Sequence, residues 1–256
     1  MTSDRTRGIA TLVAIVATIA VNGAATAIPL GGRTTGEISD SFRVFLVPSG
    51  ATFAIWGVIY GFLVAFGVYA ARAATREAPL LRRLGWLPVV SCVFNSAWIF
   101  LWQYGFFVAT LVAMLGLLVT LIAIQRITRA ATTRAERWLV AIPFSIYLGW
   151  ITVATVLNVA VGLVSLGVTE IAGIESPLVA AVVLVAAIGI ALTAIVRERE
   201  IAYGLVAVWA FYGIWVKEGA TPYVAPVAIA GAGLFLLAVA WATLERRRGW
   251  RSPAAA

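Results

Sequence analysis

Eight long apolar stretches without a charged residue divide this chain of 256 residues. A helix of about 20 apolar residues is long enough to cross the hydrocarbon core of a bilayer. In lipid a helix is favoured because it satisfies its backbone hydrogen bonds within one segment. We therefore predict an all-α integral membrane protein with eight spans. These spans cover residues 9–30, 51–71, 86–104, 106–125, 138–163, 177–196, 201–216 and 222–244.

The composition argues against several classes of function. Hydrophobic residues make up 62% of the chain and charged residues only 12%, whereas soluble domains carry about 25% charged residues. The sequence has no histidine, and its single cysteine, Cys92, lies inside an apolar stretch. The most common general base and metal ligand is therefore missing. Ion-coupled transporters usually keep ionisable groups within the membrane, and these spans have none. We expect a protein that is not an enzyme and has no obligatory cofactor or metal.

The Lys and Arg residues predict the orientation of the chain. With eight spans, the termini and the even-numbered loops share one side of the membrane, and 16 of the 19 Lys and Arg residues fall there. Only Arg33, Arg43 and Lys217 fall on the other side. Cytoplasmic loops are enriched in Lys and Arg, so we expect a multi-pass protein of the cytoplasmic membrane with both termini in the cytoplasm. The net charge of +8 then suits anionic lipid headgroups, and we expect no nucleic-acid binding.

The first span and the segment after it carry two further signals. Ala25-Thr26-Ala27 is typical of a signal-peptidase site. Because the apolar stretch continues to Leu30, we expect the span to be retained as a helix. The polar residues 31–50 are predicted to form a loop.

Aromatic and amide side chains recur on single faces of three spans, at the spacing of a helix. Buried indole and amide groups need hydrogen-bond partners in lipid, which a neighbouring helix or a ligand can supply. Flat aromatic walls with few polar groups suit a flat lipophilic ligand, although the same faces also suit packing between helices. The candidate ligand-binding residues are Phe53, Trp56, Tyr60, Asn95, Trp98, Trp102, Tyr147, Trp150, Ala154 and Asn158.

Three segments resemble the TspO/MBR family, the tryptophan-rich sensory proteins and translocator proteins. They are VPSGATFAIWGVIY, FNSAWIF and PFSIYLGWITVATVLN. The positions that match the family motifs are Trp56, Tyr60, Asn95, Trp98, Pro143, Trp150, Ala154, Leu157 and Asn158. The chain departs from the family in two places. Only Pro48, and no tryptophan, precedes the second span where the family has adjacent prolines and a tryptophan. Phe144 replaces the usual tyrosine.

The resemblance covers residues 9–163 and implies a five-helix membrane bundle that binds porphyrins between its helices, and in some members sterols and synthetic lipophilic ligands. It divides the chain into a TspO-like five-helix core, residues 9–163, and an additional three-helix membrane segment, residues 177–244. The short family members have no counterpart of this segment. We expect the extra helices to cover surface that short members use to dimerise, which favours a monomer.

Taken with the resemblance, these residues predict a membrane protein that binds a lipophilic, tetrapyrrole-like ligand, such as haem or protoporphyrin, for sensing or transport. The sequence is also compatible with two other functions. The same aromatic residues could line the path of a passive transporter or channel for a small neutral solute, or the protein could be a membrane scaffold for partner proteins. The expected partners are a lipophilic small molecule and membrane lipid.

Overall fold

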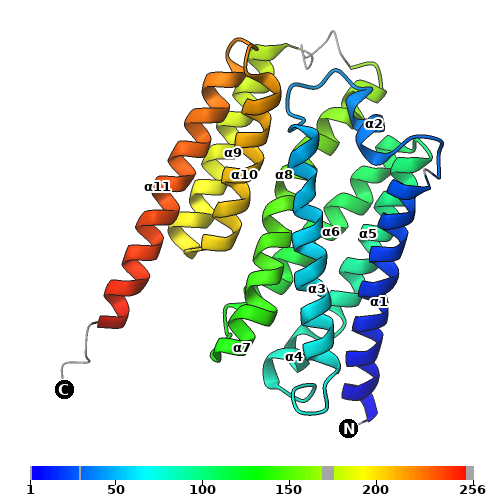
Figure 1. Ribbon diagram of the computed structural model, residues 1–256, viewed down its shortest axis with the longest axis vertical. Helices are drawn as coiled ribbons and strands as arrows, with labels where there is room; N and C mark the ends of the chain where they lie inside the picture. Colours follow the sequence, from blue (N-terminus) through cyan, green and yellow to red (C-terminus); the bar gives the residue numbers. More distant parts are fainter. Residues whose placement is uncertain (1, 29, 169–175, 252–256) are drawn as a thin grey trace.

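The protein folds into long helices that follow the eight predicted spans (Figure 1). The structure, a computed structural model, describes residues 2–28, 30–168 and 176–251, and within these ranges it has no strand. The long helices in this part of the chain are α1 (Thr2–Ala27), α3 (Ile55–Ala71), α5 (Leu87–Gln103), α6 (Phe107–Thr128), α8 (Ile142–Ser165), α9 (Pro177–Glu198), α10 (Ile201–Glu218) and α11 (Val224–Arg251).

Among the described residues, six helical segments are long and apolar enough to cross a membrane. They correspond to α1, α3, α6, α8, α9 and α11. The other two long helices, α5 and α10, have 17 and 18 residues, which is near the lower limit for a span. The protein is therefore an all-α, multi-pass membrane protein, as the sequence predicts.

Five of the helices form a closed ring. α1 packs against α3 and α5, α5 packs against α6, α6 packs against α8, and α8 packs against α3. Their buried apolar faces form one hydrophobic cluster, which includes Ile59, Phe66, Met114 and Trp150. The polar first turn of α1 is tied to the ring at one end, where Asp4 forms ion pairs with Arg7 at 2.7 Å and Arg82 at 2.8 Å.

The three C-terminal helices pack together and join the ring through α10 (Figure 1). α10 lies against α8, where Gly149 allows a close approach, because an added Cβ would lie 3.0 Å from the Cβ of Val206. The Ser145 hydroxyl of α8 lies beside the start of α10. It donates to Glu200 at 2.9 Å and accepts from the backbone N–H of Tyr203 at 3.2 Å. The ring and the C-terminal helices therefore share a buried interface.

Five short elements connect the long helices. They are α2 (Thr35–Asp40), the 3₁₀ helix η1 (Gly50–Ala54), α4 (Pro79–Leu84), α7 (Arg134–Glu136) and the π-helical turn η2 (Arg137–Ala141). The prediction that residues 31–50 form a plain loop is corrected here, because this segment contains α2. The Thr34 side chain accepts from the backbone N–H of Glu37, and Glu37 accepts from the backbone N–H of Thr34. This capping box starts the helix.

The two ends of the molecule differ. α1 begins and α11 ends at one end, together with α4 and α7, and α2 lies at the other (Figure 1). The Arg-rich loops therefore lie at the same end as the start of α1. Segment 31–54, which we call the lid, lies at the opposite end of the ring and covers the site described next.

Candidate ligand pocket

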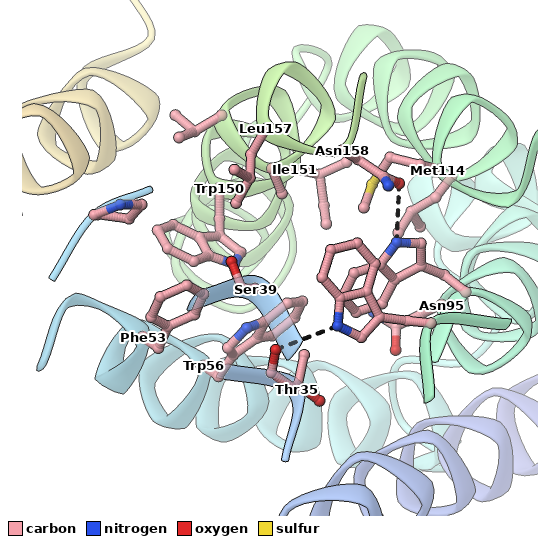
Figure 2. Close-up of a pocket in the computed structure, with 16 residues that line it drawn as sticks. Thr35, Ser39, Phe53, Trp56, Asn95, Met114, Trp150, Ile151, Leu157 and Asn158 are labelled. Atoms are coloured by element: carbon pink, nitrogen blue, oxygen red, sulfur yellow. Dashed lines mark hydrogen bonds between the residues drawn. The ribbon is translucent and has the colours of Figure 1, made fainter. Parts of the chain in front are cut away.

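A cavity lies inside the five-helix ring, beneath the lid (Figure 2). Its walls come from α3, α5, α6 and α8, and from four residues of the lid. None of its lining residues is ionisable. They are Thr35, Ser39, Pro48, Phe53, Trp56, Asn95, Trp98, Trp102, Met114, Leu117, Trp150, Ile151, Val153, Ala154, Leu157 and Asn158.

The cavity is narrow in this conformation. Its water-accessible space is about 40 Å³, room for roughly three water molecules. Pockets that hold drug-sized ligands are of the order of 300–1,000 Å³. A ligand of that size therefore requires the lid or the aromatic side chains to move outward.

Aromatic rings form the apolar walls. The Trp150 ring meets Phe53 edge-on at 5.6 Å and Trp56 edge-on at 6.3 Å. On α5, Trp98 stacks on Trp102, with ring centroids 5.4 Å apart. These geometries are the favoured ones for aromatic pairs, so the tryptophans hold one another in place.

Two asparagines connect the helices through hydrogen bonds. Asn158 of α8 accepts from Trp98 Nε1 at 3.0 Å and donates to the Thr110 hydroxyl at 2.7 Å, which joins α8 to α5 and α6. Asn95 of α5 donates to the Tyr147 hydroxyl at 2.7 Å and accepts from Asn22 of α1 at 2.8 Å. Both amides border the cavity, but their side chains are already bonded within the protein.

The lid is fixed to the ring and to α10 by separate contacts. On the ring side, Trp102 Nε1 donates to the Thr35 carbonyl at 3.2 Å, and Gln103 Nε2 donates to the Thr35 hydroxyl at 3.2 Å. On the α10 side, Trp209 Nε1 donates to the Thr52 carbonyl at 2.8 Å, and the Ser49 N–H donates to the Gly213 carbonyl at 3.0 Å.

The approach of the lid to α10 is very close. An added Cβ at Gly213 would lie 2.0 Å from the Thr52 hydroxyl oxygen, so only glycine fits this position unless Thr52 shifts. Lys217, near the end of α10, forms an ion pair with Asp40 of the lid at 2.5 Å. The additional helices therefore contact the cover of the cavity directly.

The structure brings most of the candidate residues together. Eight of the ten line the cavity. The other two, Tyr60 and Tyr147, pack behind the wall against Trp56, at 5.3 Å and 6.1 Å between ring centroids. Tyr147 contributes the hydroxyl that holds Asn95.

Sequence reasoning found Phe53 but missed the other three lid residues of the cavity, Thr35, Ser39 and Pro48, and the contribution of α6. The capping-box pattern Thr34-x-x-Glu37 was a sequence signal for α2, and with it for a rigid element that carries Thr35 and Ser39. Met114 and Leu117 lie on an apolar helix without polar or aromatic markers, so no sequence signal distinguished them from other core residues. Asn22 and Thr18 of α1 lie four residues apart, which indicated a polar face, and Asn22 does bond to Asn95.

The fold and the cavity define a multi-pass helical membrane protein with an aromatic pocket inside its helix bundle. The sequence matches the family described as TSPO-like protein over residues 8–241, and the chain belongs to this family. The match continues through α9 and α10 into α11, so it includes the three C-terminal helices. No curated protein and no solved structure matches the chain. Membership in the family indicates a role in ligand binding or transport in the membrane.

Proposed function

We propose that this protein binds a lipophilic, flat, tetrapyrrole-like ligand in the aromatic cavity, for sensing or transport. The observation that carries the proposal is the arrangement of five tryptophan and phenylalanine side chains around one uncharged space inside the helix ring. Such a site offers stacking surfaces to a flat apolar molecule and excludes water from it.

Ligand binding requires the lid or the aromatic side chains to move outward, because the present space holds only about three waters. The lid is held by hydrogen bonds, by one ion pair and by the burial of Ile38, Val44 and Val47 in one apolar cluster with the helices. A single hydrogen bond contributes about 0.5–1.5 kcal/mol and the burial of one such side chain about 1.5–3 kcal/mol, so ligand binding has to compensate for both kinds of contact when the lid moves. The helix ring itself can stay in place during this opening.

The lining residues fit the porphyrin ring better than they fit haem iron. Met114 is the one lining residue with a side chain that commonly ligates haem iron. We therefore expect metal-free protoporphyrin to bind about as tightly as haem. No residue pattern for covalent chemistry accompanies the cavity, and we propose a binding protein rather than an enzyme.

The distribution of Arg residues supports a place in the cytoplasmic membrane with both termini in the cytoplasm. The lid then faces the opposite side, and the ligand enters or leaves there. The partners we propose are the lipophilic ligand and membrane lipid, with the protein as a monomer.

A titration of the purified protein with haem and protoporphyrin tests the proposal. Saturable changes in the porphyrin absorbance spectrum at one ligand per chain would support it. Trp86, which is exposed on the helix bundle away from the cavity, provides a control: Trp86→Ala is expected to bind like the parent. No spectral change, together with flux of small neutral solutes into liposomes, would overturn the proposal and favour a passive channel.

A further inference from the structure

A polar atom without a partner marks one wall of the cavity. Ser39 of α2 is 3% exposed, and its hydroxyl makes no hydrogen bond to any described residue. The side chain extends from α2 toward the cavity and is one of its lining residues (Figure 2). A buried hydroxyl without a partner costs stability, so its place here points to a partner that the protein itself does not supply.

Two further hydrogen-bond donors lie on the same cavity. Within the described part of the chain, the indole N–H groups of Trp56 and Trp150 donate to no protein acceptor, unlike those of Trp98 and Trp102. An indole N–H can only donate, and a serine hydroxyl can donate as well as accept. The free polar groups of the cavity are therefore best suited to a hydrogen-bond acceptor.

The charges around the cavity disfavour an anionic acceptor. None of the lining residues is basic. The charges on α2 itself are the carboxylates of Glu37 and Asp40, and Asp40 is paired with Lys217. Arg33 and Arg43 of the lid are exposed and do not line the cavity. A carboxylate buried here would lose its hydration without gaining a cationic partner, which is costly inside a membrane protein.

We propose that the pocket takes a neutral ligand that presents a hydrogen-bond acceptor, such as the carbonyl of an ester, ketone or amide, to the Ser39 hydroxyl. This inference rests on the proposed function and narrows it from tetrapyrrole-like molecules in general to uncharged ones. The Ser39 hydroxyl donates to the ligand carbonyl, and the unbonded indole N–H groups of Trp56 and Trp150 provide further donors on the same cavity.

The test compares protoporphyrin with its dimethyl ester, which has the same ring but carries ester carbonyls in place of carboxylates. Binding is measured in nanodiscs of zwitterionic lipid, with empty nanodiscs as the background. The variants are Ser39→Ala and a matched control, Ser91→Ala. Ser91 is also buried, but its hydroxyl donates to the Pro88 carbonyl at 2.7 Å and it does not line the cavity.

We expect the parent to bind the dimethyl ester at least about tenfold more tightly than the free acid. Ser39→Ala is expected to weaken ester binding about 3- to 10-fold, the effect of one hydrogen bond, while Ser91→Ala binds the ester like the parent. Without ligand, Ser39→Ala should melt no lower than the parent, because the lost hydroxyl had no partner. A purely structural role of Ser39 would instead lower the melting temperature.

Two results would overturn the inference in different ways. If the acid and the ester bind equally and Ser39→Ala changes neither affinity, the preference for a neutral acceptor is wrong while the proposed function stands. If neither porphyrin binds above the empty-nanodisc background, both the inference and the proposed function are wrong.

Discussion

At the scale of single residues, the amides and the aromatic rings of the cavity have different tasks. The side-chain amides of Asn158 and Asn95 form hydrogen bonds to residues of other helices. The indole N–H groups of Trp150 and Trp56 form no hydrogen bond within the described part of the protein, and the rings line the cavity. The amides therefore hold the walls together, and the free donors and ring faces remain for a ligand.

Asn158→Ala is expected to lower the melting temperature without ligand. The change leaves the Trp98 N–H without its acceptor and removes the bond from Asn158 to the Thr110 hydroxyl, which still donates to the Phe107 carbonyl. The expected cost is about 0.6–2 kcal/mol in a membrane helix bundle. Thermal unfolding in detergent checks this. Asn22→Ala, which removes the bond to Asn95, should give a loss of similar size. An unchanged melting temperature for both variants would show that these bonds do not stabilise the ring.

The sequence predicts some residues of this site and not others, for physical reasons. Helical spacing identified eight residues that line the cavity, because polar and aromatic residues stand out in an apolar span. It could not separate Tyr147 from Trp150, which lie on the same helix face, since only the packing of α5 decides that Tyr147 bonds to Asn95. Nor could it find Ser39, because the position of α2 over the ring depends on contacts distant in sequence.

At the scale of elements, the lid depends on the cap of α2. The backbone N–H and the hydroxyl of Thr34 bond to Glu37 and hold the pKa of this carboxyl below its ordinary value of 4.5. Because the folded pKa is lowered, the cap contributes stability above pH 4.5, and this contribution is lost as the pH falls through the lowered value.

Glu37→Gln is therefore expected to loosen α2 at neutral pH, since it removes the carboxylate from the capping box. Hydrogen exchange of the α2 amides, expressed relative to the intrinsic exchange rates, checks this. The parent should lose protection of α2 only under acid conditions, and the variant should show reduced protection already at pH 7. Equal protection of α2 in the two proteins at pH 7 would contradict a role of the cap.

The contact of α10 with η1 is expected to control how fast the lid opens. Trp209→Phe keeps an aromatic ring on α10 but loses the bond to the Thr52 carbonyl. We expect a faster association of protoporphyrin, by a few-fold for the loss of one hydrogen bond, in stopped-flow measurements. Trp241→Phe on α11 is the control, because Trp241 is exposed on the helix bundle. If the association rates of the parent and of Trp209→Phe are equal, α10 does not restrain the lid.

At the scale of the whole molecule, the eight long helices bring the start of α1 and the end of α11 to one end (Figure 1). Hydropathy predicted this well, because each span is long and uncharged. The packing of α10 on both α8 and the lid could not be predicted, since it depends on close approaches at Gly149 and Gly213. These glycines are not distinguishable in the sequence from the other glycines of the chain.

Both termini are expected in the cytoplasm. A reporter that is active only in the cytoplasm, fused to the C terminus, should be active in cells, and so should one fused to the N terminus. Activity at the N terminus alone would mean an odd number of crossings, and the short α10 would then be the first helix to re-examine.

The protein is expected to be a monomer in nanodiscs, because α10 covers a face of α8. Single-molecule photobleaching of a labelled chain checks this, with one bleaching step per particle as the expected result. Gly57 and Gly61 of α3 leave open space on another face. Two-step bleaching that disappears in Gly57→Leu would contradict the expectation and identify this face as a dimer interface.

The most direct test of the cavity as the ligand site is to fill it. Ala154 of α8 lines the cavity, and Ala154→Leu places additional carbons in space that is now empty; substitutions that fill a cavity commonly stabilise a protein. If the cavity is the ligand site, protoporphyrin affinity falls at least about tenfold while the melting temperature stays at or above that of the parent. Ala186→Leu, at an exposed position of α9, should change neither quantity. Unchanged protoporphyrin affinity in a stably folded Ala154→Leu would show that the ligand binds elsewhere.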